Sequence, residues 1–281
     1  MKQASKKSVF LFLSAACLVA CSSDDEPTTV PEARPLTVEI AENTIVSTSA
    51  PQQAPTRADA ATTTATLTAF SMNYQTSTYN FMKTAGAWST ATWPTGPGNN
   101  DKINFYAYNG GNLNWNDGAP YVSFDMGTDA FAQKDLLVAD TTAAYSDNKG
   151  KVSLMFNHAC AAVRFYVRKS VEQSVSITGV ELAGVQSKGD YHYASSSWQS
   201  LSSPMTYTLT NASIGLTTEK QLLPCGYLFI IPQTKEGLTL KVSYTVNGDA
   251  KTHDFNLSGE WKAGHSYVVN VNMGTNVINA K

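Results

Sequence analysis

The sequence predicts an all-β protein made of two β-sandwich domains in tandem. Short segments in which apolar and polar residues alternate recur along the chain, and clusters of Gly, Pro and Asn separate them at regular distances. No segment shows a sustained helical periodicity. The 281 residues suffice for two sandwiches of ordinary size. We place the first domain at residues 58–170 and the second at 171–281, because the polar stretch 168–174 suits a boundary.

The N-terminus has the pattern of an export signal. Lys2, Lys6 and Lys7 precede an apolar run from Val9 to Ala20, which is too short to cross a bilayer comfortably. The run ends in Leu-Val-Ala-Cys, the pattern of a bacterial lipobox, in which small residues precede a cysteine whose sulfur takes a lipid. We therefore expect residues 1–20 to be a signal peptide and Cys21 to be lipidated. A plain signal peptide with a chance cysteine is the alternative.

Residues 21–57 are expected to form a tether, one strand and a linker. The segment opens with acidic, Pro-rich and Thr-rich sequence. Leu36, Val38 and Ile40 then alternate with polar residues, which predicts a strand. Residues 47–58 contain two prolines and many small polar residues, which is typical of an exposed linker, and Arg57 lies within it.

The first domain is predicted from successive short strands. A Thr-rich segment, 62–74, favours strand over helix, and the Pro- and Gly-rich segment 93–101 predicts a loop. The remaining strands are expected at 103–108, 121–124, 135–139, 152–156 and 160–167.

The second domain continues this pattern. Strands are expected at 175–185, 207–209, 227–232, 238–246, 255–257 and 267–273. Asn247-Gly248 predicts a tight hairpin turn, because both residues tolerate a positive φ.

Composition and motifs argue against nucleic-acid binding and against catalysis. The formal net charge is −2, so no basic excess exists to neutralise phosphates. No nucleophile elbow, zinc-protease motif, phosphate-binding loop or dinucleotide fingerprint occurs, and we expect neither an enzyme nor a cofactor. His158 and Cys160 are two apart and share one face of a strand, so they could ligate a metal. A lone pair of this kind more often packs in a core, and we predict no metal site.

Three further features leave alternatives open. Cys160 and Cys225 could form a disulfide in an exported chain, or they could be two buried thiols. The five tryptophans could line a sugar site, but core packing is the commoner role. The triplet Asp140-Thr141-Thr142 resembles a short O-glycosylation motif, and a match of this length is weak evidence.

Several stretches, taken in order, resemble the fimbrillin family of Bacteroides-type bacteria, which supplies subunits of protease-matured pili. The first is the strand pair Lys134–Ala139 and Val152–Phe165, which resembles the family pattern "DLLVA … V-x-L-x-F-x-H-A". Gly226–Gln233 and Trp261–Tyr267 resemble its final strands. The acidic residues after Cys21 are similar to the signal that sends lipoproteins of such bacteria to the cell surface.

The resemblance implies a fold and a maturation route. Family members are transthyretin-like β-sandwiches that reach the outer membrane as lipoproteins. An Arg-specific protease then removes the N-terminal piece, and a strand from the next subunit fills the vacated groove. Here the cut would fall between Arg57 and Ala58. The removed strand would carry Leu36, Val38 and Ile40.

The same resemblance implies the partners: other pilin subunits bound by strand exchange, the protease, and a host or bacterial surface receptor. A stalk subunit also needs a donor strand at its C-terminus. The tail after Met273 is short, so a donor would have to include Tyr267, Val269, Val271 and Met273 together with Val277 and Ile278. The chain is therefore expected to be a fimbrial subunit of stalk, tip or accessory type. The rival is a permanently anchored, glycan-binding surface lipoprotein, and an enzyme is a distant third.

Overall fold

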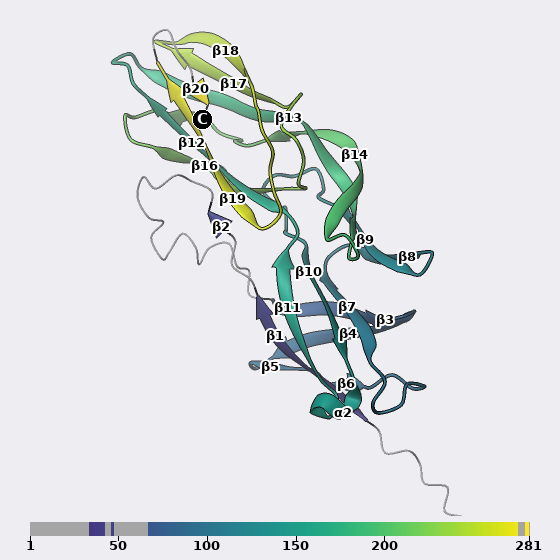
Figure 1. Ribbon diagram of the computed structural model, residues 1–281. Helices are drawn as coiled ribbons and strands as arrows, with labels where there is room; N and C mark the ends of the chain where they lie inside the picture. The colour runs from purple at the N-terminus through teal and green to yellow at the C-terminus, as the bar shows by residue number, and fades with distance from the viewer. Residues whose placement is uncertain (1–33, 43–45, 48–66, 275–278, 281) are drawn as a thin grey trace, which may run out of the picture. The chain divides into compact units, whose positions relative to one another are not determined.

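The computed structural model describes residues 34–42, 46–47, 67–274 and 279–280 (Figure 1). Strands dominate them, and the helix they contain, α2, is a single turn at Tyr145–Asn148. The all-β prediction is therefore confirmed. The predicted signal peptide, tether and linker lie outside the described residues. No helix among the described residues is long and apolar enough to cross a membrane.

The first sheet has eight strands in the order β5-β4-β3-β7-β10-β11-β1-β6. β1 pairs with β11 in parallel, and the other neighbours in this sheet are antiparallel. The strands are β1 (Pro35–Glu42), β3 (Ala69–Tyr74), β4 (Ser77–Thr84), β5 (Ala87–Trp88), β6 (Ala91–Thr92), β7 (Ile103–Asn109), β10 (Leu137–Ala143) and β11 (Lys151–His158).

The later part of the chain forms two more sheets. The order β16-β12-β19-β2 describes one, with β20 also paired to β19, and the order β18-β17-β13-β9-β8 describes the other, with β14 and β15 also paired to β13. Their strands are β2 (Val46–Ser47), β8 (Asn112–Asn116), β9 (Ala119–Asp125), β12 (Ala161–Lys169), β13 (Val175–His192), β14 (Ser197–Thr208), β15 (Ile214–Gly215), β16 (Gln221–Ile230), β17 (Thr239–Val246), β18 (Asp249–Asn256), β19 (His265–Met273) and β20 (Asn279–Ala280).

Two hydrophobic clusters form the interior, and the run of residues 136–139, which leads into β10, contributes to both. Leu137 and Ala139 lie in the first cluster with Phe105 and Phe156, whereas Leu136 and Val138 lie in the second. Successive side chains of a strand point to opposite faces. The uninterrupted apolar run 136–139 is therefore explained by a strand with a core on each side.

The predicted division at residue 170 stays a prediction. By its contacts, Arg34–Lys281 is one compact unit. Val163, Phe165 and Val167 of β12 already belong to the second cluster, although the prediction placed them in the first domain.

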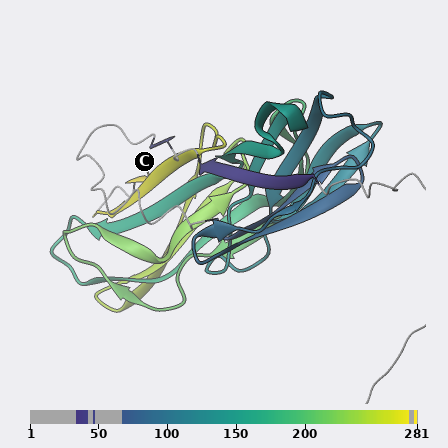
Figure 2. The ribbon, with the colours of Figure 1, turned by 90° about the horizontal axis from the view of Figure 1, so that it is seen from below.

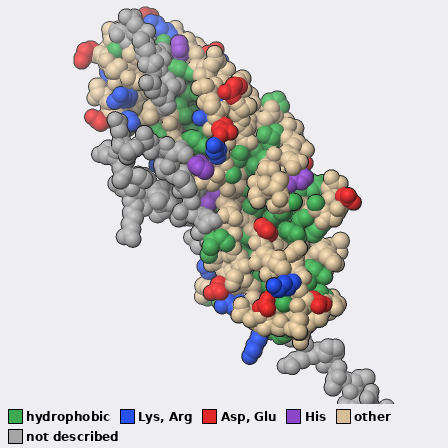
Figure 3. All heavy atoms as spheres, viewed as in Figure 1, with side chains coloured by type: hydrophobic (Ala, Val, Ile, Leu, Met, Phe, Trp, Pro, Cys, Tyr) green, Lys and Arg blue, Asp and Glu red, His purple; other side chains and the backbone are tan. Residues whose placement is uncertain are grey.

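Most of the expected strands are present, with shifted ends. The Asn247-Gly248 turn is confirmed, because it joins β17 to β18 and both residues have positive φ. β13 and β14 run much further than expected, and β4 and β8 were missed. β4 exposes most of its side chains, so it has little apolar pattern to detect. Acidic and basic side chains are interspersed on the face seen in Figure 3.

Candidate functional site

The first candidate site is the position that β1 occupies in its sheet, between β11 and β6. Thr37–Glu42 pair in parallel with Lys151–Phe156 of β11, and Pro35 and Leu36 pair with β6. Figures 1 and 2 show this strand, drawn in purple, lying alongside β11. β1 precedes Arg57 in the chain, whereas every other strand of its sheet follows Arg57. The sheet is therefore completed by a segment from the other side of Arg57.

The side chains of β1 alternate between core and solvent as predicted. Leu36 is fully buried in the first cluster, and Val38 and Ile40 pack against that cluster while partly exposed. Glu39 points outward and forms an exposed ion pair with Lys151, with 2.9 Å between Nζ and Oε2. The Lys151 ammonium lowers the pKa of Glu39 through a hydrogen bond and its charge. The burial of Leu36, rather than this surface pair, is what fixes the strand.

Arg34 fastens the start of β1 to a neighbouring loop. Its guanidinium donates to the carbonyl oxygens of Pro94 and Pro97, at 2.9 and 3.1 Å, and to Oδ1 of Asn99 at 3.0 Å. The guanidinium carbon also lies 5.4 Å from the centre of the Tyr145 ring. A charged donor with three acceptors holds its segment more firmly than neutral bonds would.

Gly150 gives β1 the room it needs at the same end. A Cβ at this position would lie 1.9 Å from the carbonyl oxygen of Pro35, which is far inside contact distance. Gly150 also has φ +82°, a conformation that L side chains rarely adopt. Its own carbonyl accepts the N–H of Thr37 at 3.0 Å. The sequence reasoning missed both Arg34 and Gly150, since neither belongs to an alternating pattern.

A second short segment ahead of Arg57 pairs with a different sheet. Val46 and Ser47 form β2, which pairs in parallel with His265 and Ser266 of β19. β20 pairs with Val271 and Asn272 of the same strand. Between these two contacts, the β19 edge opposite β12 has no partner strand among the described residues.

The candidate donor residues divide into two groups. Val277 and Ile278 lie outside the described residues, as do Cys21, Arg57 and Ala58. Tyr267, Val269, Val271 and Met273 lie in β19, which pairs with β12 from Ser266 to Met273. Val269, Val271 and Met273 are buried in the second cluster. These four residues are thus structural parts of their own sheet, and their role as a donor stays a prediction.

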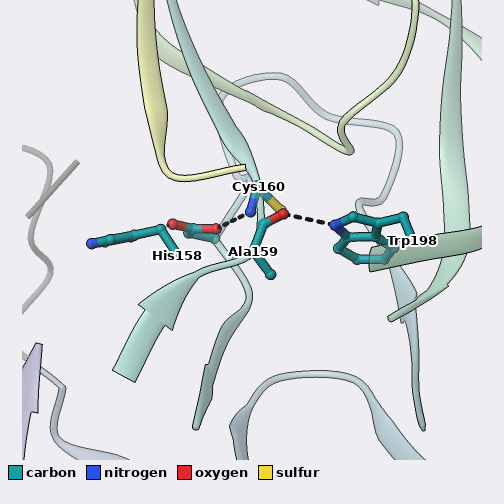
Figure 4. Close-up of polar contacts among 5 residues, drawn as sticks. His158, Ala159, Cys160 and Trp198 are labelled. Atoms are coloured by element: carbon teal, nitrogen blue, oxygen red, sulfur yellow. Dashed lines mark hydrogen bonds and ion pairs between the residues drawn. The ribbon is translucent and has the colours of Figure 1, made fainter. Parts of the chain in front are cut away.

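A buried polar cluster lies where the chain passes from the first cluster to the second. Asp135 accepts from Nδ1 of His158 at 2.5 Å and from the backbone N–H of Cys160 at 3.1 Å. The side chains of Asp135 and His158 are 9% and 3% exposed. Trp198 Nε1 donates to the carbonyl of Ala159 at 2.7 Å (Figure 4). The segment 158–160 is therefore held by hydrogen bonds to Asp135 and to Trp198.

Cys160 and Cys225 are free thiols, so the alternative of a disulfide between them is not realised. Burial and the nearby Asp135 carboxylate raise the pKa of Cys160. Burial raises the pKa of Cys225 to about 11. In the described part of the chain, no three His, Cys, Asp or Glu side chains gather in a way that could hold a metal. His158 instead engages Asp135, which fits the packing role weighed from the sequence.

The tryptophans fill different environments. Trp93 and Trp261 are buried, and Trp88 and Trp198 are partly buried against the first and the second cluster. Trp115 is partly buried and packs edge-on against Tyr106. Trp93 packs edge-on against Phe105 at 5.3 Å between ring centres. In the motif Asp140-Thr141-Thr142, which lies in β10, the Thr142 hydroxyl donates to Asn104 at 2.6 Å.

Comparison with solved structures shows that this fold is shared. A fimbrial protein from Bacteroides vulgatus superposes with a TM-score of 0.58 at 15% identity, covering 88% of this chain and 98% of that one. Candidate cell adhesion proteins from Bacteroides ovatus and Bacteroides uniformis give TM-scores of 0.55 and 0.54, both at 13% identity. Both alignments cover 89% of this chain, with 95% of the first protein and 96% of the second. These likenesses concern the fold.

The chain also matches a model of a protein family. No curated protein matches the chain. The model described as fimbrillin-like matches residues 36–280, which takes in β1, both hydrophobic clusters and β19. The chain therefore belongs to the fimbrillin-like family.

Proposed function

We propose that this chain is a structural and adhesive subunit of a surface fimbrium, matured by cleavage and joined to its neighbours by strand exchange. It would be exported as a lipoprotein through Cys21, held at the outer membrane, and cut after Arg57. The segment with β1 would then leave, and a strand from another subunit would take its place. The proposal gives the chain no catalytic role.

The observation that carries the proposal is the position of β1. This strand fills a place in a sheet whose other strands, once Arg57 is cut, would belong to a separate polypeptide. Its loss would uncover the first cluster beside Leu36 and free the β11 peptide groups that it pairs with. Unpaired peptide groups along a strand edge, next to alternating apolar pockets, are a template for an added strand.

The other arginines support Arg57 as the cleavage point. Arg34 is held by three hydrogen bonds, and Arg164 and Arg168 lie within β12, which has β16 on one side and β19 on the other. A protease needs an extended segment that it can draw into its own site, and a strand inside a sheet resists this.

The C-terminal part favours a subunit that accepts a strand without donating one. β19 is paired along its length with β12 and buries Val271 and Met273. Donating it would remove an interior strand from its own sheet. We therefore propose a tip or accessory position in the filament.

Limited digestion of the full chain with an Arg-specific protease tests cleavage. The proposal predicts one early cut that leaves Ala58 as the new N-terminus, with no early cut in an Arg57→Gln variant. An Arg168→Gln variant is the matched control and should be cut like the original chain. Resistance at Arg57, or early cleavage in β12, would contradict the proposal and favour a permanently anchored lipoprotein.

Gel electrophoresis of unheated samples of the cleaved chain tests its role in assembly. Cleaved chain alone should stay monomeric if it accepts strands but cannot donate one. A ladder of oligomers from this chain alone would overturn the tip or accessory position and establish a stalk subunit.

A further inference from the structure

The loop between β6 and β7 holds the residue that precedes β1 through the side chain of that residue, Arg34. The guanidinium donates to the carbonyl oxygens of Pro94 and Pro97, at 2.9 and 3.1 Å, and to Oδ1 of Asn99 at 3.0 Å. The Tyr145 ring lies beside it, with 5.4 Å between the ring centre and the guanidinium carbon. We call these three acceptors and the ring the Arg34 socket.

The loop is also held by contacts in which β1 takes no part. The N–H of Gly98 donates to Oδ2 of Asp101 at 2.7 Å, and the N–H of Ser146 donates to the Asn99 carbonyl at 2.8 Å. The side chain of Trp93, at the start of the loop, is buried in the first cluster. The acceptors of the socket would therefore stay in place after β1 has left.

The socket offers hydrogen-bond acceptors, and this selects for a cation. Proline has no N–H, so Pro94 and Pro97 present only their carbonyl oxygens. A guanidinium has five N–H donors and no acceptor, and an aromatic face attracts a positive charge. A carboxylate in the same place would set oxygen against oxygen. Arginine suits the socket best, and lysine comes second because its ammonium lacks the planar fork of donors.

The socket lies at a fixed spacing from the deepest apolar position of β1. Leu36, two residues after Arg34, is fully buried in the first cluster, whereas Val38 and Ile40 are partly exposed. A strand that takes the place of β1 would therefore meet a buried aliphatic position and, two residues before it, a set of acceptors. Together these two features require a sequence pattern that is narrower than an alternation of apolar residues.

We propose that the Arg34 socket selects the incoming strand, which carries an arginine or a lysine two residues before its first buried aliphatic residue. The inference rests on the proposed strand exchange and adds the chemistry of the partner. Cleavage after Arg57 would release Arg34 together with β1 and free the socket. Residues 267–278, the candidate donor segment of this chain, contain neither arginine nor lysine. The socket therefore favours a strand from a different subunit over one from a second copy of this chain.

The first test is a competition between peptides for the full chain after it has been cut at Arg57. N-acetylated peptides of residues 34–47, one native and one with Arg34→Met, are added in equal amounts, and native mass spectrometry measures the complexes with each. The native peptide should be taken up about tenfold more, because it alone makes hydrogen bonds from a charged donor. An Arg34→Lys peptide should lie between the two. A Glu39→Gln peptide, which loses only the exposed pair with Lys151, should stay within about threefold of the native one.

Two variants of the loop decide whether the socket causes this preference. Asn99→Ala removes one of the three acceptors, so the advantage of the native peptide over the Arg34→Met peptide should shrink about threefold. Asn100→Ala changes an exposed amide next to it in the same loop and is the matched control. It should leave the advantage unchanged.

A peptide of residues 267–278 provides a test by gain of binding. Tyr267→Arg in this peptide places an arginine two residues before Val269, which reproduces the spacing of Arg34 and Leu36. The altered peptide should be taken up by the cut chain about tenfold more than the unaltered one.

The outcomes separate this inference from the strand exchange on which it rests. Equal uptake of the native and Arg34→Met peptides would overturn the role of the socket, while uptake of the native peptide would uphold strand exchange. No gain from Tyr267→Arg, or equal effects of Asn99→Ala and Asn100→Ala, would also overturn the socket alone. A cut chain that takes up none of the peptides would overturn strand exchange, and the selection of a partner with it.

Discussion

Asp135 shows how one side chain can organise the passage between two cores. Its carboxylate receives His158 Nδ1 and the Cys160 N–H, and both groups are buried. We expect Asp135→Ala to lower the free energy of unfolding by about 3 kcal/mol, because it leaves two buried donors without an acceptor. Urea denaturation measures this. Asp249→Ala, which removes an exposed carboxylate, is the control and should cost less than about 0.5 kcal/mol. If Asp135→Ala lowered the free energy of unfolding as little as Asp249→Ala does, the buried hydrogen bonds of Asp135 would not contribute to stability.

Cys225 yields a prediction about pH. Its pKa is raised to about 11 by burial, so at pH 8 only about one molecule in 1000 carries the reactive thiolate. Alkylation by iodoacetamide, followed on the Cys225 peptide by mass spectrometry, should therefore accelerate about tenfold per pH unit up to pH 10. A rate that levels off near pH 9 would refute the raised pKa. Unfolded chain, whose thiols titrate normally, is the control.

Arg34 is expected to hold β1 in place through its guanidinium. An Arg34→Met variant keeps an aliphatic side chain but loses the three hydrogen bonds that the charged guanidinium donates. We expect the free energy of unfolding in urea to fall by about 2 kcal/mol. Arg168→Met serves as the matched control, since Arg168 is exposed. An unchanged stability of Arg34→Met would mean that water replaces these bonds without loss.

Residues of this kind mark the limit of prediction from sequence. The alternation of Leu36, Val38 and Ile40 is visible in the chain, because a half-buried strand needs a period of two. Arg34, Gly150 and Asp135 act through contacts with residues distant in sequence. Nothing in the local pattern around them shows which carbonyl or ring they will meet.

At the scale of one element, β1 should be held mainly by its inward face. Replacing Leu36, Val38 and Ile40 with Ser should destabilise the precursor by about 5 kcal/mol, because a fully buried aliphatic and two partly buried ones lose their apolar contacts. Thermal and urea unfolding measure the change. The paired control Glu39→Ser with Ala41→Ser alters the outward face and should cost less than about 1 kcal/mol. An unchanged melting curve in the triple variant would count against β1 as part of the core.

The strands that sequence reasoning found and missed differ in burial. β11 exposes and buries alternate residues, so its pattern predicts it directly. β4 is largely exposed and has little apolar pattern. In β14, Leu201, Met205 and Tyr207 turn toward the second cluster, but Ser203 between them breaks the apolar alternation. β13 runs for 18 residues, although only its first part was expected, because Gly184 and Gly189 interrupt the apolar pattern. Gly184 has φ +86°, and its position coincides with a shift in the β13–β14 register.

At the scale of the molecule, the all-β class could be predicted from the sequence, but the sharing of strands between two cores could not. Phe105 and Ala107 of β7 lie in the first cluster, while Tyr106 and Tyr108 pack against the second. A run that is apolar on both faces is compatible with several kinds of buried strand. Only the tertiary arrangement shows that such runs join the clusters.

The central claim is that β1 occupies a groove that another strand can fill. It is tested most directly by hydrogen exchange of the backbone amides in Lys151–Phe156 of β11, for which β1 is the described partner strand. The amides bonded to β1 should be protected in the precursor and should exchange rapidly after cleavage and removal of the N-terminal piece.

Addition of a peptide spanning residues 34–47 should then restore protection. A peptide with Ser in place of Leu36, Val38 and Ile40 should fail to do so. Amides that stay protected once the N-terminal piece is gone, or a native-sequence peptide that restores nothing, would contradict the account.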